Sequence, residues 1–101
     1  MAQLVVSEAA DNDTRDMLSY LAQEAGARMA AKYLGLLGHL YDQLEAYPES
    51  GHPRPKLGEA TRIGIVRPFV VIYDYAADTD AVTILRILHG NRNLTRKLLR
   101  G

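Results

Sequence analysis

The apolar positions in the first half of the chain follow the period of two amphipathic helices. After Ser7, which stands where a helix N-cap belongs, apolar residues are spaced three and four apart up to about Ala25. From Ala30 onward the same spacing predicts a second helix, which ends before Pro48 because a proline drives the preceding residue out of the helical region. Gly26 is expected to stop the first helix in a left-handed conformation. A connection this short predicts an antiparallel helical hairpin.

Two glycines, Gly35 and Gly38, interrupt the second predicted helix. Each costs a helix about 1 kcal/mol relative to alanine, because glycine loses more backbone freedom on folding. We expect that their missing side chains allow a close approach of the first helix or of a partner protein.

Short apolar stretches in the rest of the chain predict β-strands. We expect strands at residues 3–6, 61–66, 69–75 and 82–89. A loop rich in glycine and proline, from Gly51 to Pro55, precedes the second of them, and Pro68 marks a tight turn. The stretch at 69–75 is almost wholly apolar or aromatic, which favours burial on both faces of a sheet. Helices and strands together predict one α+β domain over residues 1–101.

The last predicted strand carries an arginine and ends on a histidine. Strict alternation would put Arg86 in one row with Val82, Ile84 and Leu88, and His89 in the other row with Thr83, Leu85 and Ile87. Arg86 would then either pair with a carboxylate such as Asp74 on the neighbouring strand or point into a groove at the sheet surface. His89 is either a general acid or base, or a hydrogen-bonded structural residue.

The composition excludes several kinds of site. The chain has no cysteine, which excludes disulfides and thiolate-based metal or redox centres. No histidine has a partner at ligand spacing and no phosphate-binding glycine motif occurs, so we expect no metal and no cofactor. The N-terminus lacks signal-peptide features, and no segment reaches the roughly 18 apolar residues that a membrane helix needs. We therefore expect a cytoplasmic protein that does not bind a membrane.

The formal net charge is zero, but the charges are unevenly distributed. The first 50 residues carry three Lys and Arg against eight Asp and Glu, and the last 51 carry nine against four, giving net charges of −5 and +5. A basic side of the fold can steer polyanions or an acidic protein toward it. The simpler interpretation is that the arginines only solvate the strands and the tail.

Five parts of the chain, in order, resemble the ParE toxins of the RelE/ParE superfamily. Each motif is loose by itself, whereas the ordered set covers essentially the whole chain. The parts are residues 7–20 (SEAADNDTRDMLSY), 47–57 (YPESGHPRPKL), Arg62, 67–73 (RPFVVIY) and 84–93 (ILRILHGNRN). The resemblance implies a β-α-α-β-β-β fold, in which an antiparallel helical hairpin packs on a small, mainly antiparallel four-stranded sheet.

The resemblance also implies a function. ParE toxins belong to bacterial type II toxin–antitoxin systems, and a ParD-like antitoxin neutralises them by wrapping its C-terminal segment around the toxin. Members are described as poisoning DNA gyrase and so arresting replication. We accordingly expect a gyrase inhibitor that is not an enzyme and that meets operator DNA only indirectly, through the antitoxin.

The alternative within the superfamily is a RelE-like, ribosome-dependent mRNA endonuclease. Cutting RNA needs a base, a cation beside the phosphate and an acid for the leaving group. The candidates for this chemistry are Arg62, Arg86 and His89. The tail after Gly90 carries no tyrosine and the proline loop is not rich in lysine, which favours gyrase inhibition. A plain scaffold or DNA-binding module is the third class, although no recognition-helix signature supports it.

Charge layout and resemblance together predict the binding residues. Gly35 and Leu36 are expected to meet the amphipathic helix of the antitoxin. The arginines and the lysine expected to line or border its groove are Arg54, Lys56, Arg62, Arg67 and Arg86. The candidates for target binding are the basic residues of the tail, Arg92, Arg96 and Lys97.

Overall fold

The computed structural model describes residues 1–90 and Leu99, which fold into two helices and five strands. Their bounds are Gln3–Val6 (β1), Glu8–Ala25 (α1), Ala27–Ala46 (α2), His52–Pro53 (β2), Thr61–Val66 (β3), Phe69–Ala76 (β4) and Ala81–His89 (β5). Both helices and the four longer strands stand where the apolar spacing predicts them. The prediction of an α+β fold with a helical hairpin is confirmed.

The five strands form one sheet in the order β1-β5-β4-β3-β2. All neighbouring strands are antiparallel except β1, which runs parallel to β5. The prediction of four strands was wrong by one, because His52 opposite Ile63 and Pro53 opposite Arg62 form the short strand β2 within the proline loop. A strand of two residues has no periodic pattern of its own, and its position depends on β3 rather than on its own sequence.

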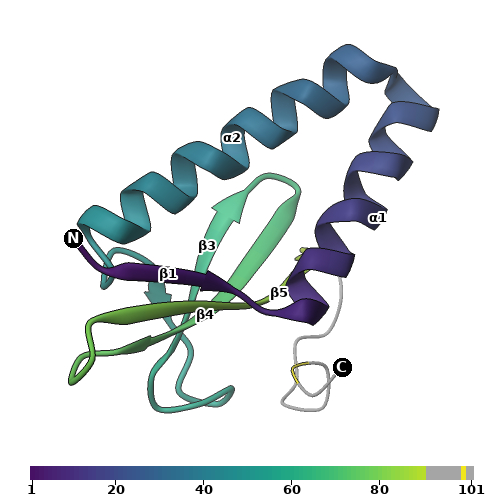
Figure 1. The fold of residues 1–101 in the computed structure, drawn as a ribbon. Helices are drawn as coiled ribbons and strands as arrows, with labels where there is room; N and C mark the ends of the chain where they lie inside the picture. The colour runs from purple at the N-terminus through teal and green to yellow at the C-terminus, as the bar shows by residue number, and fades with distance from the viewer. Residues whose placement is uncertain (91–98, 100–101) are drawn as a thin grey trace.

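Both helices lie on the same side of the sheet and bury one of its faces (Figure 1). α1 packs over β5, while α2 packs over β3 and touches β1. The helices contribute the apolar residues that recur at helical spacing, and the strands contribute alternate residues. This core includes Met17, Leu21, Leu37, Leu44, Val71, Tyr73, Val82 and Ile84. The apolar residues that recur at helical spacing in the sequence therefore form the face of each helix that packs on the sheet.

The opposite face of the sheet carries a second, smaller apolar cluster. It contains Leu57 from the loop before β3 and strand residues that include Val70, Ile72 and Leu88, and Leu99 packs against it. β4 thus sends Val71 and Tyr73 to the first core and Val70 and Ile72 to the second. The prediction that this strand is buried on both faces is confirmed.

A β-bulge divides β5 and corrects its predicted faces. Ile72 of β4 lies opposite Arg86 and Tyr73 lies opposite Ile84, so Leu85 has no partner on β4. The extra residue reverses the alternation, and Ile87 joins Ile84 in the first core while Leu88 turns to the second. The prediction that Ile84, Arg86 and Leu88 share one row was wrong, because alternation holds only in an unbulged strand.

The structure confirms the predicted start and end of α1 but not the predicted role of the glycines in α2. Ser7 caps α1, accepting a hydrogen bond at Oγ from the N–H of Ala10 at 3.1 Å. Gly26 ends α1 with a φ of 94°, so the glycine stop is confirmed, although its ψ of 165° is extended rather than left-handed helical. A Cβ placed on Gly35 or Gly38 would meet no atom within 4 Å. The expected close approach of α1 to these glycines was therefore wrong, and both are open to a partner.

Candidate functional site

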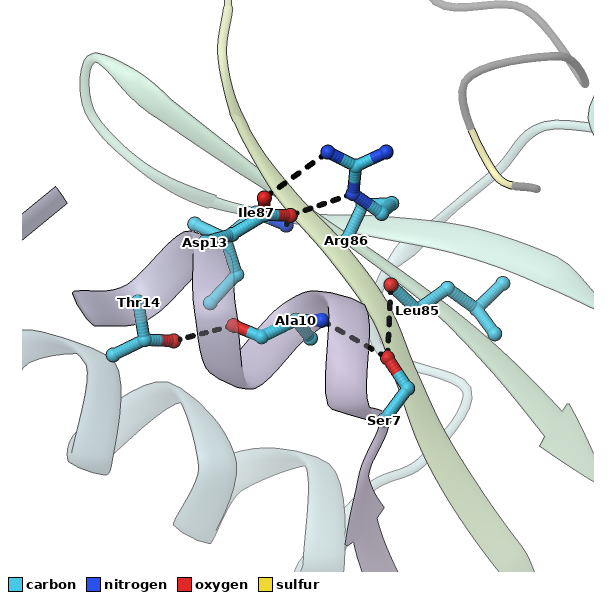
Figure 2. Close-up of polar contacts among 7 residues, drawn as sticks. All are labelled: Ser7, Ala10, Asp13, Thr14, Leu85, Arg86 and Ile87. Atoms are coloured by element: carbon cyan, nitrogen blue, oxygen red, sulfur yellow. Dashed lines mark hydrogen bonds and ion pairs between the residues drawn. The ribbon is translucent and has the colours of Figure 1, made fainter. Parts of the chain in front are cut away.

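Arg86 forms an ion pair with Asp13 of α1 (Figure 2). Its Nε and Nη2 donate to the two carboxylate oxygens at 2.7 and 3.0 Å, and the side chains of Arg86 and Asp13 are only 15% and 13% exposed. The hydrogen bonds from Arg86 to Asp13 raise the pKa of Arg86 above its usual value. The predicted pairing of Arg86 with a carboxylate is confirmed, but the partner is Asp13 of α1 rather than a residue such as Asp74 on the neighbouring strand, and the alternative of an open groove was wrong. Asp74 instead accepts a hydrogen bond from Thr61.

The same carboxylate completes the backbone hydrogen bonding of β5. β1 pairs with β5 only as far as Ile84, so among the described residues no parallel strand continues along the later edge of β5. Ser7 continues the contact, donating from its N–H to the carbonyl of Ile84 and from Oγ to the carbonyl of Leu85, both at 3.0 Å. Asp13 then accepts a hydrogen bond from the N–H of Ile87 at 2.9 Å. Arg86 is therefore part of a joint that fixes α1 to the bulged half of β5.

Arg62 is also bound within the fold. Its Nη1 donates to the carbonyls of Glu49 and Gly51, both at 2.9 Å, and its Nη2 lies 3.6 Å from the Glu49 carboxylate. The buried Tyr73 hydroxyl supports the same turn, donating to the carbonyl of Pro48 and accepting from the N–H of Gly51. Burial raises the pKa of Tyr73, which keeps its hydroxyl a donor. Arg62 thus holds the turn between α2 and β2.

A groove runs between α2 and the free edge of β3, and we call it the basic groove. Its central part has a volume of about 430 Å³ and is walled on the helix side by Lys32, Leu36 and His39 and on the strand side by Ile65 and Arg67. Leu36 is 40% exposed and Ile65 is 48% exposed, so each wall of the groove includes an apolar residue that is in contact with solvent. Two predicted antitoxin residues, Leu36 and Arg67, are brought together here.

The basic groove continues in both directions. Toward the C-terminal end of α2 it shares Leu40, Gln43 and Ile65 with a pocket that reaches His52. Toward the β3–β4 turn it shares Ile65 and Arg67 with a pocket that reaches His89. All three histidines of the chain therefore line the groove or its two extensions.

A different cavity lies between the two helices and the ends of β4 and β5. It has a volume of about 550 Å³ and is lined mainly by apolar and aromatic side chains, with Asp13 and Asp16 on its α1 side. The ring of Phe69 at its base is edge-on to the rings of Tyr33 and His89, at 5.8 and 5.9 Å between centroids. His89 thus packs against an aromatic ring at the sheet end.

The remaining predicted site residues lie elsewhere. Arg54 and Lys56 are exposed in the loop after β2, and Arg54 donates to the carbonyl of Pro53. Gly35 is exposed on α2. The predicted target-binding residues Arg92, Arg96 and Lys97 lie outside the described residues.

Within residues 1–90 and Leu99, His, Asp and Glu side chains nowhere gather in a group of three or more suited to a metal ion. Neither α1 nor α2, the helices of this described part, is long and apolar enough to cross a membrane.

Most of the chain matches a known family. Residues 4–94 match the family model described as the ParE toxin of the type II toxin–antitoxin system parDE. The chain belongs to the ParE toxin family. It is also similar to Toxin ParE3 of Caulobacter vibrioides, with 26% identity over 98 residues that cover 97% of this chain and 96% of that protein. The resemblance found in the ordered motifs is confirmed.

Solved structures share the fold of this ParE family member. The chromosomal ParDE system from P. aeruginosa matches with a TM-score of 0.72 and 21% identity, covering 88% of this chain and 96% of that one. The RelBE2 toxin–antitoxin complex from Mycobacterium tuberculosis matches with a TM-score of 0.63 and 17% identity, covering 87% and 96%. The isolated RelE toxin of E. coli matches with a TM-score of 0.60 and 16% identity, covering 92% and 88%. These toxin structures therefore share the fold of this chain.

Proposed function

We propose that this ParE-type toxin inhibits DNA gyrase and that a ParD-like antitoxin neutralises it. The observation that carries the choice of target is the internal ion pair of Arg86 with Asp13. A cation that neutralises a carboxylate of its own fold offers little charge to a phosphate, and RNA cleavage depends on such a cation. The pair therefore favours a toxin that acts by binding.

The other residues considered for RNA cleavage support the same choice. Arg62 is committed to the carbonyls of Glu49 and Gly51, whereas Arg86 is committed to Asp13. His89 lies at the end of β5, against the ring of Phe69. The two guanidinium groups bind separate internal partners, and this is unlike a catalytic arrangement in which cations and a base converge on one phosphate.

The proposed partner is an acidic antitoxin that acts in the cytoplasm, where gyrase is also found. The basic groove offers exposed apolar side chains between cations, which suits a partner that combines apolar and acidic residues. Contact with operator DNA would come through the antitoxin within the complex.

Induced expression in a bacterial host tests the proposal. Gyrase inhibition should stop incorporation of labelled thymidine before that of labelled amino acids, and broken chromosomal DNA should accumulate. Co-expression of a cognate ParD-like antitoxin, which we expect to be a short acidic protein encoded beside the toxin, should restore growth. If translation stops first and messages are cut at the ribosome, the chain is a RelE-like endonuclease. Normal growth under strong expression would contradict both assignments.

A further inference from the structure

The cavity between the two helices and the ends of β4 and β5 has mainly apolar walls, and we call it the interhelical cavity. Its volume of about 550 Å³ lies within the range of about 300–1,000 Å³ that is usual for ligand pockets. The side chains around it include Met17 and Leu21 of α1, Met29 and Tyr33 of α2, and Phe69 of β4. The cavity can therefore hold an apolar side chain of a binding partner.

The α1 side of this cavity carries negative charge. Asp13 and Asp16 line it, and no lysine or arginine is among its described lining residues. Asp13 is occupied within the fold, because both of its carboxylate oxygens accept hydrogen bonds from Arg86. Asp16 is exposed, and none of the ion pairs between described residues includes it. The cavity therefore has one carboxylate at its solvent side that can pair with a cation from outside the fold.

An exposed aromatic ring lies near this carboxylate. Tyr20 also lines the cavity, and it is 60% exposed. Asp16 and Tyr20 are four residues apart on α1, so the helical period places them next to each other on one face. A carboxylate pairs with a guanidinium or ammonium group, and the face of a tyrosine ring attracts the same cations. The two residues together suit the charged head of an arginine or a lysine.

The interhelical cavity and the basic groove are opposite in charge. The basic groove includes Lys32 and Arg67, and no carboxylate is among its described lining residues. The cavity has two carboxylates in its α1 wall, and α1 as a whole carries five acidic residues and one basic residue. An enzyme that handles DNA carries lysines and arginines along the path of its substrate, because these residues neutralise phosphates. The charge of the cavity therefore suits the proposed target better than an acidic antitoxin.

We propose that the interhelical cavity binds a basic segment of the target protein. An apolar side chain of this segment enters the cavity, and a neighbouring arginine or lysine pairs with Asp16 beside the ring of Tyr20. This inference rests on the proposed function for the identity of the target, which is gyrase. A nucleic acid fits less well, because its phosphates would be repelled by Asp16 and would leave the apolar walls without contacts.

Charge reversal at the cavity tests the proposal with a matched control on the same helix. Asp16→Lys changes a carboxylate that lines the cavity, and Glu24→Lys makes a similar change at an exposed residue of α1 that is not among the lining residues. The readout is inhibition of supercoiling by purified bacterial gyrase at low salt. The toxin concentration for half-maximal inhibition should rise at least about tenfold for Asp16→Lys and less than about twofold for Glu24→Lys. Tyr20→Ala should raise it by about fivefold, and circular dichroism checks that the three variants fold.

The methionine methyl groups provide a second readout. The chain has three methionines, of which Met17 and Met29 line the cavity, whereas Met1 is 95% exposed and is not among the lining residues. The probes are overlapping synthetic peptides that cover the gyrase sequence. Peptides that bind should carry an apolar residue next to a lysine or an arginine. They should shift the methyl NMR signals of Met17 and Met29 and leave that of Met1 unchanged.

The outcomes separate the inference from the proposed function. If the unchanged chain inhibits gyrase but Asp16→Lys and Glu24→Lys have equal effects, or if the bound peptides leave Met17 and Met29 unshifted, the inference is overturned and gyrase inhibition stands. If the unchanged chain neither inhibits gyrase nor binds its peptides, the proposed function fails and the inference fails with it. Shifts of Met17 and Met29 caused by self-association, or by an oligonucleotide in place of the basic peptides, would also overturn the inference.

Discussion

Replacing Asp13 with alanine tests the joint between α1 and β5. The substitution removes two hydrogen bonds from Arg86 and one from the N–H of Ile87, all between 2.7 and 3.0 Å long. It leaves the Arg86 guanidinium, now without its carboxylate, in a side chain that is only 15% exposed. The substitution also removes the carboxylate that accepts the hydrogen bond from the Ile87 N–H, and Ile87 is buried.

The expected loss follows from these contacts. Breaking a fully buried pair from one side costs about 3–5 kcal/mol, and the low but nonzero exposure of Arg86 places this site at the lower end. We expect Asp13→Ala to lower the free energy of unfolding by about 3 kcal/mol, which for a chain of this size lowers the Tm by roughly 14 °C.

Urea and thermal denaturation measure this loss, with a surface ion pair as the control. Asp11 and Arg15 are one helical turn apart on α1, and Arg15 Nη2 lies 2.8 Å from Asp11 Oδ2. Their side chains are 61% and 68% exposed. Asp11→Ala should therefore cost less than about 1 kcal/mol. Arg86→Met and the double variant complete a cycle, in which the effects of the Asp13 and Arg86 changes should not add. Equal losses for Asp13→Ala and Asp11→Ala, or additive effects, would refute the reasoning.

Four further changes have defined effects on thermal stability. Tyr73→Phe removes hydrogen bonds to Pro48 and from Gly51 and should cost about 2 kcal/mol; an unchanged Tm would contradict this. Gly51→Ala places a Cβ 2.7 Å from the carbonyl oxygen of Ile63 and against the Tyr73 hydroxyl, so it should also cost about 2 kcal/mol, and a neutral effect would show that the turn can move. Gly38→Ala meets open space and should stabilise α2 by about 1 kcal/mol, whereas a loss would reveal an unseen contact. Burial raises the pKa of Tyr41 to about 12, and its hydroxyl has no hydrogen-bond partner among the described residues. Tyr41→Phe should therefore stabilise the fold by about 1 kcal/mol, and a destabilised variant would indicate that the hydroxyl has a partner.

The elements with local signals could be predicted from the sequence. Helical spacing, the Ser7 cap and Gly26 are properties of neighbouring residues, and the apolar run of β4 indicates burial on both faces without knowledge of its neighbours. The bulge in β5 could not be predicted, because it depends on how β5 aligns with β4. β2 depends in the same way on its pairing with β3.

The candidate site could be predicted only in part. Asp13 and Arg86 are 73 positions apart, and no local pattern connects them. For the basic groove, Leu36 and Arg67 were predicted as binding residues, and the structure places them on facing walls. Lys32 and His39 were not predicted. Lys32 precedes Leu36 by four residues and His39 follows it by three, so the helical period of the sequence already places both on the same face of the helix as Leu36. Ile65 was missed because an open strand edge exists only once the sheet is assembled.

The most direct test of the account is a supercoiling and cleavage assay with purified bacterial gyrase. Addition of the folded chain should stop supercoiling of relaxed plasmid or trap cleaved DNA, and addition of the antitoxin should reverse this effect. The same preparation should leave messenger RNA intact on translating ribosomes. Full gyrase activity together with cut messages would contradict the account.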